Sequence, residues 1–74
     1  MERNQGYTIL KKRCIGNTGF ALGYNSKAPQ PYVTWQFRRS MPHEYFWGHY
    51  YTDKSAAHKD YRRRIAERRY EPER

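Results

Sequence analysis

The sequence has few of the features that secretion or membrane insertion requires. Among its 74 residues there is one cysteine, Cys14, so no disulfide can form within the chain. No apolar run approaches the ~20 residues of a membrane-crossing helix. Residues 1–6 lack the apolar core of a signal peptide. These absences predict a cytoplasmic protein that does not bind a membrane.

Metal ligands and catalytic groups are also scarce. The three histidines and Cys14 show neither the paired-cysteine nor the paired-histidine spacing of a zinc site. Of the carboxylates Glu44, Asp53 and Asp60, Asp53 (or Thr52 in its place) is expected to cap a helix and Asp60 to pair with Arg64 on the helix surface. Acid–base chemistry also needs a cleft, for which one sheet and one helix leave little depth. The segment 16–19 lacks the lysine and the helix of a phosphate-binding loop. We therefore expect no catalytic residue, no metal and no cofactor, and a protein that is not an enzyme.

Basic and aromatic residues are abundant. Fifteen Lys and Arg against seven Asp and Glu give a net charge of +8, and aromatic residues make up 18% of the chain. The mean hydropathy of −1.30 is low, but disordered chains are usually poor in aromatics, so we expect a folded chain. One small domain spanning residues 1–74 is predicted. The positive charge favours polyanionic partners, with nucleic acid first.

Four segments predict β-strands, at about 6–15, 19–24, 32–38 and 45–51. The third alternates most clearly, with an apolar side that we expect in the core and a polar side that we expect to face solvent. The apolar side consists of Val33, Trp35 and Phe37, and the polar side of Thr34, Gln36 and Arg38. In the fourth segment, Gly48 predicts a β-bulge or a close approach by another part of the chain.

A helix is predicted over about 53–70, followed by a frayed tail at 71–74. Ala57, Tyr61 and Ile65 recur at four-residue spacing and form a narrow apolar stripe. The expected fold is therefore α+β. It consists of a small antiparallel meander of three to four strands and one C-terminal amphipathic helix packed on one face of the sheet.

Two basic surfaces are candidates for nucleic-acid binding. One is the polar face of the third strand, where side chains can reach base edges, and the other is the helix, where cations can hold phosphates. The candidate base readers are Thr34 and Gln36, and the candidate phosphate ligands are Arg38, Arg39, Arg62, Arg63 and Arg64. A solvated polar sheet face and a charged solvent-facing side of the helix are the alternatives for these residues.

The stretch from Tyr32 to Ile65 resembles the arm-type DNA-binding domains at the N-termini of some tyrosine integrases. It contains two strands and then the aromatic, threonine and alanine residues of the segment 48–57 that lead into a helix. That resemblance implies a sheet that docks in the major groove of DNA. The additional first strand departs from the pattern.

A second resemblance covers most of the chain. The segments 6–9, 20–23, 28–37 and 45–51 resemble short uncharacterised proteins of conjugative and integrative elements in gut Firmicutes. It implies a mobile-element setting and no particular activity.

The function that we expect is non-enzymatic nucleic-acid binding, to DNA rather than RNA, by an accessory protein of a mobile element. The alternative is a protein-interaction module that docks a protein partner, or a second copy, on the aromatic fourth strand through Trp47 and Tyr51. A small enzyme or ligand-binding regulator is a third reading, and it would require a pocket.

Overall fold

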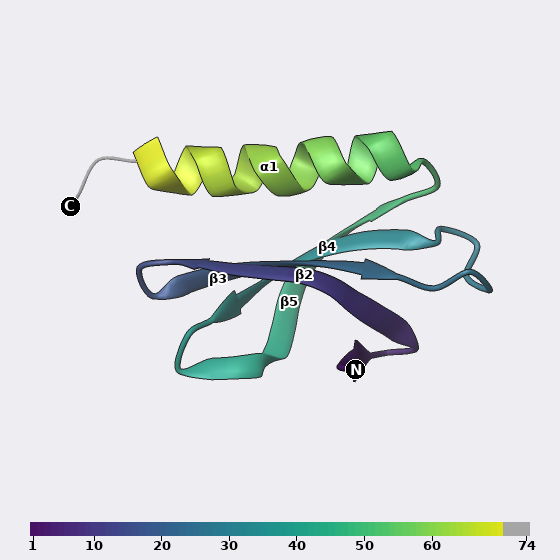
Figure 1. Ribbon diagram of the computed structural model, residues 1–74, viewed down its shortest axis with the longest axis horizontal. Helices are drawn as coiled ribbons and strands as arrows, with labels where there is room; N and C mark the ends of the chain where they lie inside the picture. The colour runs from purple at the N-terminus through teal and green to yellow at the C-terminus, as the bar shows by residue number, and fades with distance from the viewer. Residues whose placement is uncertain (71–74) are drawn as a thin grey trace.

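The computed structural model describes residues 1–70 and has one helix lying across a curved antiparallel sheet (Figure 1). The strands lie side by side in sequence order. They are β1 (Arg3–Asn4), β2 (Tyr7–Ile15), β3 (Thr18–Tyr24), β4 (Tyr32–Arg38) and β5 (Met41–Tyr51), and the helix is α1 (Lys54–Tyr70). The α+β class and the antiparallel meander are confirmed. The tail predicted at 71–74 lies outside the described residues.

The sheet has five strands, so the prediction of three to four was too low. The additional strand β1 is two residues long and pairs with the start of β2. Gln5 and Gly6 join the two strands with φ angles of 51° and 86°, as a tight hairpin turn requires. Two residues carry no alternation of polar and apolar positions, so the sequence pattern gave no sign of β1.

The strand β5 is also longer than predicted, because it begins at Met41 and not near Tyr45. Its early part contains Pro42, which normally argues against a strand because proline cannot donate a backbone hydrogen bond. Proline is tolerated here since β5 is an edge strand and the ladder is irregular at this point: Phe37 pairs with Tyr45, whereas Arg38 pairs with Met41.

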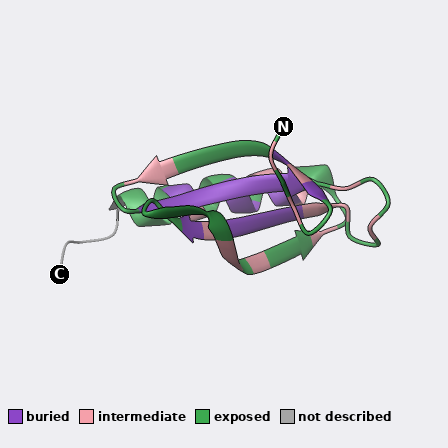
Figure 2. Ribbon diagram, turned by 90° about the horizontal axis from the view of Figure 1, so that it is seen from below, coloured by how far each residue is buried: buried purple, intermediate pink, exposed green. Residues whose placement is uncertain are grey.

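Buried residues lie along the central strands of the sheet and on α1 (Figure 2). Apolar side chains are buried on both faces of the sheet. On the face toward α1, Phe20 and Leu22 of β3 pack against Ala57, Tyr61 and Ile65. These three helix residues are the predicted apolar stripe, which is confirmed. Burial of this stripe holds the helix on the sheet, because a short helix is stabilised mainly by packing of its apolar face.

The opposite face contains a second cluster, formed by Tyr7, Ile9, Ala21, Val33, Trp35 and Phe37. The predicted burial of the apolar side of β4 is therefore confirmed. The ring of Tyr45 on β5 packs on this face, 5.4 Å from the ring of Trp35 and 5.6 Å from that of Phe37. The sheet curves over the same face, because Lys12 Nζ of β2 lies 5.3 Å from the centre of the Tyr45 ring although β3 and β4 separate the two strands. The sheet thus approaches a barrel, and an almost closed sheet shields an apolar interior without a second helix.

A polar cluster centred on Glu2 joins the edges of the curved sheet. The Glu2 carboxylate accepts hydrogen bonds from Lys12 Nζ at 3.1 Å and from the Tyr45 hydroxyl, and it lies 2.8 Å from His43 Nδ1. Lys12 Nζ also donates to the Pro42 carbonyl oxygen at 2.8 Å, which links β2 to β5. Burial raises the pKa of Glu2, but these hydrogen bonds and the Lys12 charge outweigh it and lower the pKa to about 2.

Replacing Glu2 by Gln should remove an acid-sensitive part of the stability. Because the pKa falls from 4.5 in the unfolded chain to about 2 in the fold, the carboxylate stabilises the protein fully above pH 4.5. That stability is lost as the pH falls from 4.5 toward 2. We expect Glu2→Gln to cost about 1 kcal/mol at pH 7 and progressively less in acid, measured by urea unfolding. The control is Glu44→Gln, at an exposed carboxylate of β5; an equal loss in both variants would contradict the role of Glu2.

Candidate nucleic-acid interface

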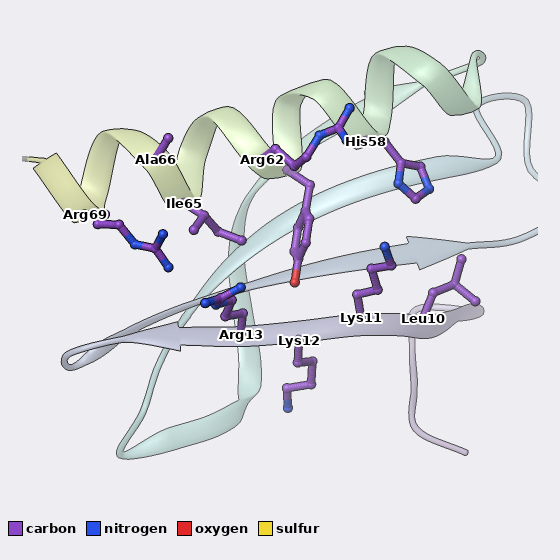
Figure 3. Close-up of a pocket in the computed structure, with 10 residues that line it drawn as sticks. Leu10, Lys11, Lys12, Arg13, His58, Arg62, Ile65, Ala66 and Arg69 are labelled. Atoms are coloured by element: carbon purple, nitrogen blue, oxygen red, sulfur yellow. The ribbon is translucent and has the colours of Figure 1, made fainter.

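A groove of about 740 Å³ lies between β2 and α1. Lys11 and Arg13 of β2 point toward the helix, and Arg62 and Arg69 of α1 line the other side (Figure 3). Apolar atoms of Tyr61 and other residues also line it. The groove is therefore a basic channel with an apolar component.

A β-bulge in β2 places the two strand cations in the groove. Ile9 pairs with Gly23 and Lys11 with Leu22, so Leu10 has no partner on β3. One additional residue reverses which side chains face each side of a strand. Lys11 and Arg13 therefore lie on the helix side, while Lys12 points to the other face and binds Glu2 (Figure 3). Without the bulge, Lys12 would face the helix, and Lys11 and Arg13 would face the opposite side of the sheet.

The positive charge of the groove is not neutralised by the described part of the chain. Lys11, Arg13, Arg62 and Arg69 are all exposed, none forms an ion pair with a carboxylate of residues 1–70, and no described lining residue is acidic. Four like charges along one channel repel each other and attract polyanions. The arrangement suits a row of phosphates.

His58 lies in the same groove and responds to these charges. Its Nε2 is buried and has no hydrogen-bond partner within the described structure. Burial lowers the pKa of His58, and the charges of Lys11, Lys54 and Arg62 lower it further. His58 is therefore neutral at pH 7, and the groove obtains its charge from lysine and arginine.

The predicted arginine triplet does not act as one unit. Arg62 faces the groove, whereas Arg63 donates to Asp60. Arg64 is held on the β4–β5 side, where Nη1 donates to the Thr34 carbonyl and hydroxyl oxygens at 3.2 and 3.0 Å and Nη2 donates to the Trp47 carbonyl oxygen at 3.0 Å. Since consecutive helical residues point about 100° apart, the three side chains reach different surroundings.

Thr34 is buried beneath α1 and does not lie on an open sheet face. Its hydroxyl donates to Asp60 Oδ2 at 2.6 Å, and both residues are almost inaccessible to solvent. The expectation that the polar side of β4 faces solvent was wrong at this position, because the helix packs on that side. A buried hydroxyl with its partners inside the protein does not reach a base edge.

The predicted ion pair between Asp60 and Arg64 is present, but Asp60 lies in the protein interior and not on the helix surface as predicted. It contacts Arg63 directly, lies 3.0 Å from His49 Nδ1, and is 4.0 Å from Arg64 Nη1. Burial raises the pKa of Asp60, but hydrogen bonds from Thr34 and His49 and the charges of His49 and Arg63 lower it below its usual value. The carboxylate joins α1 to β4 and β5.

The other predicted site residues lie on the β4–β5 hairpin. Gln36 is half-buried, while Arg38 and Arg39 are exposed. The guanidinium of Arg38 lies 5.6 Å from the centre of the Phe46 ring. These three remain on an accessible surface, apart from the groove between β2 and α1.

Sequence reasoning missed Lys11, Arg13 and His58 as members of a site, and it considered Arg69 only as one of the helix cations that could hold phosphates. The basic run of β2 was visible, but its alignment with the helix depends on the bulge at Leu10. The spacing of positions 58, 62, 65 and 69 places these residues on one helical face. That spacing was the feature of the sequence from which the helix side of the groove could have been predicted.

Among residues 1–70, no group of three or more histidine, cysteine or acidic side chains could hold a metal ion. No helix in that range has the length and apolar character for crossing a membrane. Comparison with protein-family models, curated proteins and solved structures found no match to this chain.

Replacing Asp60 by Ala should destabilise the fold severely. The change leaves the Thr34 hydroxyl, His49 and Arg63 without their shared partner and Arg64 without the nearby opposite charge. Breaking such a buried network typically costs about 3–5 kcal/mol. Asp60→Asn, which keeps the shape and one acceptor, should cost less. Urea unfolding at pH 7 measures both, and a loss below about 1 kcal/mol for Asp60→Ala would show that the network does not hold the helix.

His58 should make the fold less stable in mild acid. Its pKa is lower in the fold than in the unfolded chain, so the unfolded chain takes up the proton first as the pH falls through 6.5. Stability should therefore fall between pH 7 and 5, and His58→Gln should flatten that slope. Thermal melts across this range test it, with Lys59→Gln, an exposed change on the same helix, as the control that should keep the slope.

Proposed function

We propose that this protein binds nucleic acid, DNA rather than RNA, without catalysing a reaction, and that the groove between β2 and α1 holds the phosphate backbone. The observation that carries this proposal is the set of four exposed cations, Lys11, Arg13, Arg62 and Arg69, on one channel with no acidic lining residue in the described chain. The preference for DNA and the mobile-element setting rest on the sequence resemblances alone.

The chemistry of the groove suits phosphate. Each guanidinium of Arg13, Arg62 and Arg69 can offer paired N–H donors to phosphate oxygens, and the Lys11 ammonium adds a point charge. Neutralising backbone phosphates releases their counterions, which drives binding and makes it weaken with salt. His58, which is neutral, and the apolar atoms of Tyr61 also line the channel, and they add no negative charge that would repel phosphate.

The predicted site residues divide according to their place in the fold. Arg62 is part of the groove. Arg38 and Arg39 are exposed on the hairpin and can contact further phosphates, as can Arg63, whose side chain is 61% exposed beside Asp60. Gln36 keeps an accessible amide, so it remains a candidate base reader. These roles are secondary, because the hairpin lies apart from the groove.

The alternative function, protein docking on the aromatic surface of β5, has less support. Tyr51 and Tyr45 pack against the two apolar clusters, and Phe46 is half-buried. Trp47 is the most exposed aromatic of this strand, Tyr50 is also exposed, and cations flank Trp47. Protein interfaces usually bury an apolar centre with few charges, which this surface does not provide.

The double variant Lys11→Ala/Arg62→Ala should weaken binding to a labelled DNA duplex and to a single strand of the same length. Removing two phosphate contacts should lower the slope of log K against log salt by about 2, and the affinity at low salt by about 10-fold or more. Fluorescence anisotropy at several salt concentrations measures both quantities.

The matched control is Lys27→Ala/Lys59→Ala, which removes two exposed charges from outside the groove. It should change the affinity by less than about threefold. An equal loss in both variants would mean that net charge, and not the groove, determines binding. No binding of the unmodified protein to either nucleic acid at low salt would contradict the proposed function itself.

A further inference from the structure

A β-bulge on β5 exposes Trp47. Thr34 pairs with His49 and Gln36 with Phe46, so Trp35 on β4 lies opposite two residues, Trp47 and Gly48. Trp47 has a φ of 54°, a left-handed conformation that is rare for a bulky residue, and 68% of its surface is exposed. Strained backbone and bulges of this kind concentrate at functional sites.

The surrounding structure fixes the main chain at this bulge. Arg64 Nη2 donates to the Trp47 carbonyl oxygen at 3.0 Å, and Nη1 of the same side chain is bonded to Thr34. Gly48 lies so close to Trp35 that a Cβ atom there would be 2.8 Å from the indole Nε1. The backbone of Trp47 is therefore held while its ring faces solvent.

The two tryptophans differ in their environment. Trp35 is 2% exposed and belongs to the core. Trp47 contacts Phe46 edge-on, with ring centres 5.0 Å apart and planes at 85°. Leaving a large ring in water forgoes the stabilisation that burial would give, so folding alone does not account for its placement.

The surroundings of Trp47 combine cations with aromatic and polar side chains. It lines two neighbouring hollows: the first also contains Phe20, Gln36, Arg64, Glu67 and Arg68, and the second Thr18, Gln36, Phe37, Arg38 and Phe46. Three arginines thus accompany one carboxylate among these residues. An exposed aromatic ring, an amide and cations together match the parts of a nucleotide: a flat base, hydrogen-bonding edges and a phosphate.

We propose that Trp47 is a stacking platform for an unpaired nucleobase, which makes single-stranded nucleic acid the preferred ligand. This inference rests on the proposed function, because it adds a base contact to the phosphate contacts of the groove. Bases within a duplex are stacked on each other and do not offer a free face, whereas every base of a single strand does. Gln36 is placed to contact the edge of the stacked base, and Arg38 its phosphate.

The test compares Trp47→Gly and Trp47→Phe with the unmodified protein. Glycine accepts the positive φ at this position without strain, so the Gly variant keeps the fold while losing the ring. We expect it to bind a 12-nucleotide oligo-dT about 10-fold more weakly and a duplex of the same length with unchanged affinity. Trp47→Phe, which keeps an aromatic face, should stay within about threefold of the unmodified protein on both.

Intrinsic fluorescence provides a second readout. Oligo-dT should quench the emission of the unmodified protein, and Trp47→Phe should lose that quenching, because the remaining Trp35 is buried. Unchanged oligo-dT affinity in Trp47→Gly, or an equal loss for oligo-dT and duplex, would overturn the stacking role. If Lys11→Ala/Arg62→Ala still weakens binding in that case, the groove binds nucleic acid and only the stacking role of Trp47 is wrong. If the unmodified protein binds neither oligo-dT nor duplex, the proposed function itself is wrong.

Discussion

The contact between Asp60 and the sheet determines how the helix presents its charges. A carboxylate in the interior is tolerated only when hydrogen bonds and opposite charges compensate for lost hydration. Thr34, His49 and Arg63 supply this compensation from β4, β5 and α1. Because these partners fix the rotation of the helix about its axis, Arg62 faces β2 while Arg64 faces β5.

Irregularities in the strand pairing decide which side chains reach each surface. The sheet alternates its faces at every residue, so a single unpaired residue exchanges the two faces beyond it. At Leu10 this exchange turns Lys11 and Arg13 toward the helix, and opposite Trp35 it exposes Trp47. Both candidate binding surfaces therefore begin at a bulge, and they lie on opposite sides of α1.

Three of the described carboxylates have hydrogen-bond partners within the fold. Glu2 joins β2 and β5, Asp60 lies under the helix, and Asp53 caps α1 by accepting a hydrogen bond from the Ala56 backbone at 3.1 Å. Each of these negative charges has partners within the fold. The cations Lys11, Arg13, Arg62 and Arg69 form no ion pair with these carboxylates, which favours association of the groove with polyanions.

The sequence by itself determined that the strands come first and one helix follows. It also determined the buried apolar side of β4 and the apolar stripe of α1, because these features follow from local periodicity and from breaks at Gly and Pro. The cap at Asp53 and the bulge near Gly48 were also predictable from local rules. The groove was not, since it requires Leu10 to leave the ladder and α1 to settle over β2. Similarly, Thr34 lies on the polar side of the β4 alternation, which predicts exposure to solvent. Only the packing of the helix on that face buries Thr34 with Asp60. The tertiary structure decided these points because a polar residue's exposure depends on which element covers it, and residues distant in the chain make that choice.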